Sequence, residues 1–171
     1  HLLGLYPGNA ITDKTPELIE ACKVSLLDRG FGQKSGANGS GWGKANKVNL
    51  WARAKDGKRA YSMLRELINK NIAPNLWDFH PPYQMDGNCG YTSGVCEMLC
   101  YSSDDIIELL PALPEEWKNG SVKGLCARGG YSLDFTWENG EIKSLSVYSS
   151  CGKKTARIKT GDEIKTVKTV G

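Results

Sequence analysis

The spacing of apolar residues changes from a helical period to a strand period near residue 103, and this change limits the possible folds more than any other feature of the sequence. Before it, "TPELIEACKVSLLDRG" places Ile19, Cys22 and Leu26 on one helix face, with Thr15 as a candidate N-cap. The segments "KANKVNLWARAKDG", "KRAYSMLRELINKN" and "YTSGVCEMLCYS" repeat that spacing. The sequence therefore predicts a helical half that runs to about residue 102.

The second half alternates apolar and polar side chains, as half-buried strands do. The run "SVKGLCARGGYSLDFTWENGEIKSLSVYSS" shows this alternation, and its Asn139 and Gly140 are the residues that a type I′ hairpin turn requires. "KTARIKTGDEIKTVKT" adds two shorter strands around Gly161 and Asp162. We expect an α+β multidomain chain, with helices over residues 1–102 and a small antiparallel β-sheet or sandwich domain over residues 103–171.

Charge and hydropathy argue against nucleic-acid and membrane partners. The chain has 22 Lys and Arg against 19 Asp and Glu, a net charge of +3, and its basic residues are scattered among acids and threonines. No apolar run approaches the ~18 residues of a membrane span. The chain begins with His1, without a signal peptide, so we expect a processed chain or one piece of a longer protein.

Six cysteines are spread along the chain without a metal-binding pattern. None forms a C-x-x-C pair and neither histidine lies near a matching cysteine pair, so we expect no metal and no cofactor. Only Cys96 and Cys100 are expected to share a helix face. Buried free thiols are favoured over disulfides, because a chain of this length needs no covalent cross-links. The six are Cys22, Cys89, Cys96, Cys100, Cys126 and Cys151.

The segment "HPPYQMDGNCG", residues 80–90, combines polar groups with residues that stiffen the backbone. Pro81 and Pro82 restrict the chain upstream of Asp86, which stands near a predicted helix start. One interpretation makes Asp86 a helix cap, since the helix dipole favours an anion there. The other makes it a carboxylate held for acid–base work, close to a histidine that can bind a ligand. Spacing alone leaves both open.

The tryptophans allow two interpretations. Trp42, Trp51 and Trp77 lie beside Gly, Asn, Arg and His, a mixture suited to a sugar ring with one apolar face and a rim of hydroxyls. Tryptophan is also usually well buried, so these residues could fill the core between helices instead. In the second half, Trp117 and Trp137 are the candidate platforms if that domain binds glycans; otherwise its role is structural.

Several of these segments together resemble the C-terminal part of a glycoside hydrolase family 95 α-L-fucosidase. The resemblance covers residues 1 to about 150, and agreement among several motifs in one order is more specific than any single motif. The segments are "HLLGLYPGNAIT", "TPELIEACKVSLLDRG", "GSGWGKANKVNLWARAKDGKRAY", "NLWDFHPPYQMDGNCGYTSGVCEML" and "ELLPALPEEWKNGSVKGLCARGGYSLDFTW".

The resemblance implies a fold and an activity. The family has an (α/α)6 barrel that holds the active site, followed by a C-terminal β domain, so residues 1–102 would be the last barrel helices and 103–171 the β domain. It implies hydrolysis, with inversion and without metal, of terminal L-fucose in α-1,2 linkage to galactose. A fucosylated oligosaccharide would be the substrate.

The resemblance also implies roles for particular residues. In the family's version of the loop the histidine contacts the sugar, and the aspartate helps to activate water through neighbouring asparagines; these positions match His80 and Asp86. Trp42 and Asn88 are further candidates for the pocket. Cys89 replaces the family's usual aromatic residue, which leaves the choice between α-L-fucosides and α-L-galactosides open.

The family's general acid glutamate and asparagine pair would precede the first residue, so we expect this chain alone to be inactive. An incomplete barrel would also leave an apolar face through which chains could associate. The family resembles secreted or cell-surface bacterial enzymes, whereas unpaired cysteines favour a reducing interior, so the compartment is open. The residues expected on the uncovered face are Leu2, Leu5, Leu18, Ile19 and Leu50.

Overall fold

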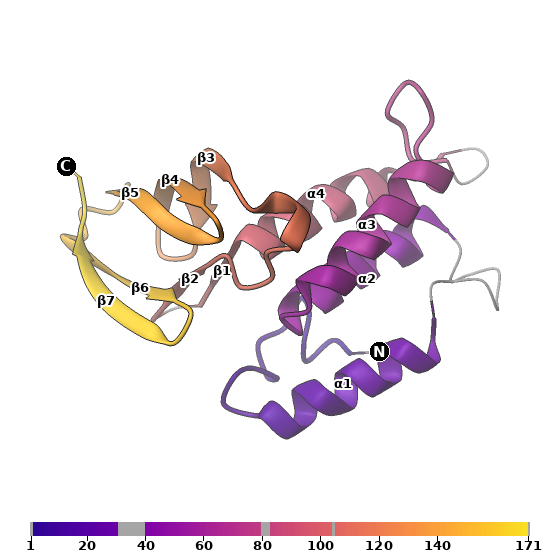
Figure 1. Ribbon diagram of the computed structural model, residues 1–171, viewed down its shortest axis with the longest axis horizontal. Coiled ribbons are helices and arrows are strands. Elements are labelled where there is room, and N and C mark those ends of the chain that lie inside the picture. The colour runs from indigo at the N-terminus through magenta and orange to yellow at the C-terminus, as the bar shows by residue number, and fades with distance from the viewer. Residues whose placement is uncertain (1, 31–39, 80–82, 104, 171) are drawn as a thin grey trace. The chain divides into compact units, whose positions relative to one another are not determined.

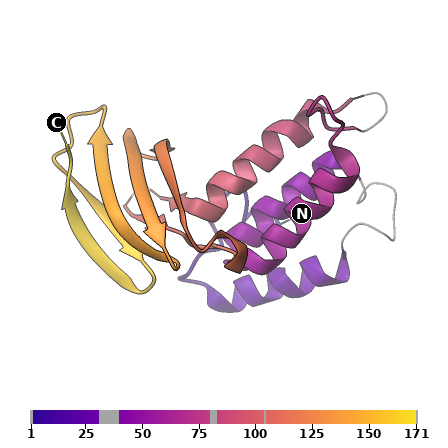
Figure 2. The same cartoon turned by 45° about the horizontal axis from the view of Figure 1, so that its top comes forward.

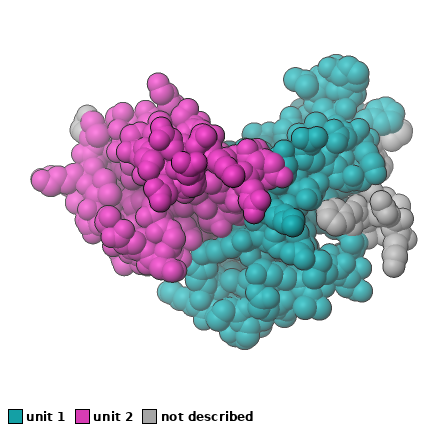
Figure 3. Space-filling view, in the orientation of Figure 1, with its two compact units in different colours: residues 1–98 teal, residues 99–171 magenta. Residues whose placement is uncertain are grey.

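The computed structural model consists of two compact units, residues 1–98 and 99–171 (Figures 1 and 3). It describes residues 2–30, 40–79, 83–103 and 105–170. The first unit is helical and the second is made of strands. The predicted order of helices before strands is therefore confirmed.

The described part of the first unit holds α1 (Pro16–Asp28), α2 (Gly41–Arg53), α3 (Gly57–Asn71) and α4 (Met85–Leu99). Side chains cap two of these helices: Ser40 Oγ accepts from Gly43 N at 3.2 Å, and Asp56 Oδ1 accepts from Arg59 N at 2.9 Å. Thr15 occupies the N-cap position of α1 as predicted, but its hydroxyl bonds to the backbone of Thr12 instead of capping the helix.

Helix α2 lies beside both α3 and α4 (Figure 2) and has more buried residues than any other helix that the structure describes. The expectation that Leu5, Ile19 and Leu50 would face nothing is wrong, because all three are buried. Leu50 is covered because α2, which carries it, packs against α3. Leu18 is exposed as expected, and further exposed apolar residues of this unit are Leu3, Val24 and Leu27.

Glycines on α4 allow this helix to approach α2 closely. A β-carbon on Gly90 would lie 2.9 Å from Ala45 Cβ, and one on Gly94 would lie 2.5 Å from Val48 Cγ1. Such separations are shorter than close-packed interiors tolerate, so a larger residue would push the helices apart. Asn49 joins them further, because its Nδ2 donates to Gly90 O at 2.8 Å. The start of α4 is therefore held on α2.

Two sheets enclose the core of the second unit, one in the order β1-β2-β6-β7 and the other β3-β4-β5. The elements are β1 (Cys100–Ser102), β2 (Ile107–Leu109), the short 3-10 helix η2 (Glu115–Trp117), β3 (Gly120–Ala127), β4 (Tyr131–Glu138), β5 (Glu141–Ser149), β6 (Thr155–Thr160) and β7 (Glu163–Lys168). Both sheets contribute to one buried cluster, as in a β-sandwich. Its members are Ile107, Leu109, Leu133, Phe135, Trp137, Val147, Ala156 and Ile158.

Two features of this unit differ from the prediction. The last helix ends at Leu99 instead of residue 102, because Cys100–Ser102 pair with β2 as an antiparallel strand. Cys96 and Cys100 therefore do not share a helix face. In addition, β2 and β6 pair in parallel, with Ile107 opposite Ile158. The three-stranded sheet lies between them in sequence, and this long connection permits the parallel pairing.

The thiols are not buried as a group. All six are free and lie in the described residues, but only Cys22 is buried, where burial raises the pKa of its thiol. Cys89, Cys126 and Cys151 are exposed, so the expectation of buried thiols is wrong for them. For Cys126 the reason is its position on the outward face of the β3 alternation.

Candidate active site

The segment between α3 and α4 forms a loop whose base is closed by backbone pairing. Ile72 and Asp78 form an isolated antiparallel bridge, and Ala73 N donates to Trp77 O at 2.8 Å. This pairing fixes where the chain enters the predicted site segment. His80, the predicted sugar-contacting residue, lies outside the described residues, and its role stays a prediction.

Asn88 fastens this loop to the first turn of α4. Its Oδ1 accepts from Asp78 N at 2.8 Å, and its Nδ2 donates to Leu76 O at 2.8 Å. Gln84 N donates to Asp78 O at 3.3 Å on the returning side of the loop. The side chain predicted to line a pocket therefore holds the loop in place, and a contact between Asn88 and a sugar remains a prediction.

Asp86 is the second residue of α4 and is exposed. It stands within the helix and not at the N-cap, although the dipole still favours an anion in this first turn. Among the residues that the structure describes, its carboxylate has no side-chain hydrogen bond or ion pair. An exposed carboxylate on a packed helix start is available to a ligand, which leaves the acid–base interpretation open and weakens the capping one.

Trp42 lies next to the same helix face as Asp86. Its backbone N donates to Gln84 Oε1 at 3.1 Å, which joins the start of α2 to the loop. A β-carbon on Gly90 would lie 3.1 Å from the Trp42 ring, so the ring rests on α4 at this glycine. Asp86 and Gly90 are four residues apart and share a helix face. The fold thus places Trp42, which is 42% exposed, against α4 one helical turn away from Asp86.

The remaining tryptophans divide between core and surface. Trp51 is buried in the helical core, and Trp137 is buried in the β core, where its Nε1 donates to Trp117 O at 2.7 Å. The prediction that Trp137 could serve as a glycan platform is therefore wrong. Trp77 is 56% exposed, and its ring centroid lies 4.8 Å from that of Tyr83 across the loop. Trp42 and Trp77 are thus the tryptophans of the helical unit with accessible ring faces.

Sequence reasoning missed a fully buried carboxylate at the base of the loop. Asp78 has an exposed fraction of 0%. A β-carbon on Gly41 would lie 1.7 Å from Asp78 Oδ1, and one on Gly87 would lie 1.5 Å from Oδ2. Each oxygen thus fills the space of a missing side chain at the start of α2 or α4. The signal in the sequence was a glycine at each of these helix starts, in "GSGWG" and "MDGN".

A buried lysine lies near this carboxylate. Lys44 Nζ, with 4% of the residue exposed, donates to Asn71 Oδ1 at 2.7 Å and lies 3.7 Å from Glu66 Oε1. Burial lowers the pKa of Lys44, while the carboxylates of Glu66 and Asp78 act in the opposite direction. The loop base therefore contains charges of both signs in a region with little access to water.

Several glutamates that could have served as an acid are engaged in ion pairs. Arg53 holds Glu97 with both Nε and Nη2, the latter at 3.2 Å from Oε1. For Glu66 the hydrogen bond from Lys70 lowers the pKa of the carboxyl, which makes it a poor proton donor. The pairs are Glu20–Lys23, Glu66–Lys70, Glu97–Arg53 and Glu108–Lys159.

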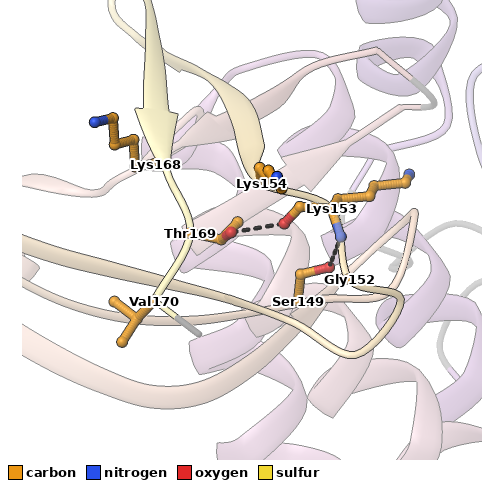
Figure 4. Close-up of a pocket in the computed structure, with 7 residues that line it drawn as sticks. All are labelled: Ser149, Gly152, Lys153, Lys154, Lys168, Thr169 and Val170. Carbon is orange, nitrogen blue, oxygen red and sulfur yellow. Dashed lines mark hydrogen bonds between the residues drawn. The ribbon is translucent and has the colours of Figure 1, made fainter.

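A separate pocket of about 440 Å³ lies in the β unit (Figure 4). Its polar groups bond mainly to one another: Lys153 N donates to Ser149 Oγ at 3.0 Å, and Thr169 Oγ1 donates to Lys153 O at 2.6 Å. The side chains of Lys153 and Lys168 point in opposite directions. The lining, which also includes Gly152, Lys154 and Val170, does not bring charges together on a ligand.

The described residues fit neither a metal site nor a membrane-spanning segment. No group of three or more His, Cys, Asp or Glu in them could hold a metal ion. Within the same residues, no helix is both long enough and apolar enough to cross a membrane.

Comparison with known proteins matches both units. The model of the glycosyl hydrolase family 95 catalytic domain matches residues 1–99, and that of the family's C-terminal domain matches residues 101–170. The chain is 36% identical over 162 residues to "Alpha-L-fucosidase 2" of Arabidopsis thaliana, covering 87% of this chain and 18% of the relative. It is 34% identical over 161 residues to "Probable alpha-fucosidase A" of Aspergillus oryzae, covering 81% of this chain and 22% of the relative.

A similar protein of Aspergillus niger is 31% identical over 179 residues, covering 93% of this chain and 22% of the relative. The chain thus spans about a fifth of the length of these relatives. They come from a plant and two fungi, so they lend no support to a bacterial source.

Proposed function

The chain belongs to glycoside hydrolase family 95, and on this basis we propose that the protein containing it hydrolyses terminal α-1,2-linked L-fucose from galactose-containing glycans with inversion. Its three relatives are named as α-fucosidases. A fucosylated oligosaccharide is the proposed substrate. Residues 1–102 are proposed to be barrel helices and residues 103–171 the β domain that follows them.

One observation supports the proposal most: Asp86 is an exposed carboxylate on a helix start that packing holds in place. Gly90 and Gly94 fix α4 on α2, and Asn88 ties the loop to the same helix. Trp42 adds an exposed aromatic side chain on the same helix, one turn away from this carboxylate. A sugar has an apolar face and a rim of hydroxyls, so an aromatic face beside a carboxylate matches its chemistry.

Inversion assigns the two catalytic tasks to opposite faces of the sugar. One group activates a water while another protonates the departing oxygen, and the two stand about 6.5–9.5 Å apart to leave room for that water. We assign Asp86 to the side of the water and His80 to binding the sugar. Asp86 need not abstract the proton directly, since polar side chains between it and the water can relay the effect.

The general acid is proposed to come from a part of the catalytic domain that these 171 residues do not include. Glu20, Glu66, Glu97 and Glu108 are already held in ion pairs with lysine or arginine. This chain alone is accordingly proposed to be inactive, and activity is to be sought in the product of the complete reading frame.

The test replaces Asp86 and His80 in that complete product. Asp86→Asn is expected to lower kcat for an α-1,2-fucosylated oligosaccharide by about 10²–10⁴-fold, the range typical of acid–base groups. His80→Ala, which removes the side chain assigned to binding the sugar, is expected to lower kcat/KM for the same substrate. Thermal unfolding should change little for Asp86→Asn, because this side chain is exposed.

Asp162→Asn is the matched control, since Asp162 is exposed in the turn between β6 and β7 and should leave turnover unchanged. Turnover by Asp86→Asn within about threefold of wild type would exclude the assigned role.

A further inference from the structure

We propose that Asp78 is a positioning residue that sets the location of Asp86 by holding together the starts of α2 and α4. This inference rests on the proposed function, because it gives Asp78 a task in the same reaction. It adds a residue that the loop motif does not contain. Asp78 lies before the motif and its side chain is buried, so it acts on the site only through the backbone that it supports.

The Asp78 carboxylate fits into the space that two glycines leave free. Asp78 Oδ1 and Oδ2 lie where the β-carbons of residues 41 and 87 would otherwise be, at 1.7 Å and 1.5 Å from those positions. Gly41 is the first residue of α2, and Gly87 is the third residue of α4. One side chain therefore packs against the starts of two helices that lie far apart in the sequence.

The contact of Asp78 with the two helix starts is also electrostatic. The N-terminus of a helix has a partial positive charge from its unpaired backbone N–H groups, and an anion there is favourable. Two such ends meet at Asp78, and the cation of Lys44 interacts with the same carboxylate. Replacing the anion by a neutral amide of the same shape would leave the positive ends facing each other with less compensation.

The contacts of Asp78 with Gly41 and Gly87 reach the candidate site through the backbone. Gly87 directly follows Asp86, so a shift of the Gly87 backbone moves the Asp86 carboxylate with it. On the other side, Gly41 precedes Trp42, whose backbone N bonds to Gln84. Asp78 thus touches a chain neighbour of Asp86 and a chain neighbour of Trp42. Displacing a reacting group by as little as 1 Å can lower a rate by about 10²-fold.

The principal test is Asp78→Asn in the product of the complete reading frame, with kcat and KM measured on an α-1,2-fucosylated oligosaccharide. We expect kcat to fall by about 10–100-fold while KM changes by less than about threefold. In an Asp86→Asn background the same substitution should lower the residual rate by less than about twofold, because the residue that Asp78 positions is already impaired.

A purely structural role gives a different result: equal loss in both backgrounds would contradict the inference, as would unchanged kcat in Asp78→Asn. The wild-type rate separates the two proposals. Fucose release by the wild type that is insensitive to Asp78→Asn refutes only the positioning role. No fucose release by the complete wild-type protein refutes the proposed function and the catalytic role of Asp78 with it.

If Asp78→Asn does not fold, Gly87→Ala provides the test, since its methyl group would displace the carboxylate or the helix start while the charge remains. We expect kcat to fall by more than about tenfold and Tm to drop. Gly4→Ala is the control: its β-carbon would meet Ile11 at an ordinary 3.4 Å. Wild-type kcat in Gly87→Ala would overturn the inference.

Discussion

The close contact between α2 and α4 at Gly94 gives a prediction in which the sign of one substitution depends on a second residue. In Gly94→Ala the new methyl carbon would lie 2.5 Å from Val48 Cγ1, where ordinary contacts begin at 3.4 Å. The helices or the valine must move by roughly 1 Å, and overpacking of this kind costs about 1–3 kcal/mol. Alanine regains about 1 kcal/mol over glycine within a helix. The net expectation is destabilisation of up to about 2 kcal/mol.

Truncating Val48 removes the nearer of the two atoms that create the conflict. In a Val48→Ala background the β-carbon of residue 48 still lies 3.0 Å from the new methyl carbon, a contact that a shift of a few tenths of an ångström relieves. Helix propensity should then outweigh the remaining contact, so Gly94→Ala should stabilise the protein by up to about 0.5–1 kcal/mol. The difference between the two backgrounds is the coupling energy of the pair. Urea unfolding followed by tryptophan fluorescence measures it, since Trp51 is buried in the same unit. Thr92→Ala, on the exposed side of α4, serves as the control.

The same stability change for Gly94→Ala in both backgrounds would refute the close packing of α2 on α4. Because that packing is the argument for a fixed Asp86, the result would also remove the structural basis of the candidate site. A sign reversal supports both.

Two further predictions concern ion pairs in the helical unit. Lys70 lowers the pKa of Glu66 by hydrogen bonding, so this carboxylate stabilises the fold fully above its ordinary pKa of 4.5 and loses the effect as pH falls through the lowered value. Glu66→Gln should therefore lower the free energy of unfolding by about 1–3 kcal/mol at pH 7, and should leave it unchanged at a pH where Glu66 is protonated. Thermal melts of both proteins across pH measure this difference, and a loss of stability that does not depend on pH would contradict the prediction. Arg53→Leu should lower the free energy of unfolding, measured in urea, by about 3 kcal/mol, because Glu97 then loses its cation. Arg53→Lys should restore only part of this free energy, since lysine cannot form the bidentate pair that arginine makes with a carboxylate. Full recovery by lysine would argue against it.

The parts of the fold that sequence reasoning found are those with a strong local signal. The buried stripe of α1, with Ile19, Cys22 and Leu26, follows from helical spacing alone. The turn between β4 and β5 was predicted from two residues that tolerate a left-handed backbone, and both Asn139 and Gly140 have positive φ, at 51° and 78°. Here local preference and tertiary structure agree, so neither homologues nor contacts were needed.

The parts that it missed depend on contacts between segments far apart in the sequence. Strands β1 and β2 have three residues each, too few for a period, and become strands because they pair with each other and with β6. The three tryptophans of the helical unit have similar neighbours in the sequence, yet only Trp51 is buried. Which ring is covered depends on how α2 and α4 meet, which composition does not reveal.

Asp78 shows the same limit within the candidate site. In the sequence it is one carboxylate among aromatic residues, "LWDFH", and nothing nearby distinguishes it from a solvated loop residue. Its importance is visible only when Gly41 and Gly87 are brought to it from two other segments. Asp86, by contrast, could be selected in advance because the stiff loop and the family resemblance both pointed to it.

The most direct test of the central claim is a proton NMR time course of an α-1,2-fucosylated oligosaccharide with the product of the complete reading frame. The account predicts fucose release in which β-L-fucose appears first and the α anomer follows only by mutarotation, because inversion of an α-fucoside gives the β product. Initial appearance of α-L-fucose, or no release at all, would contradict the proposed inverting fucosidase and the role assigned to Asp86.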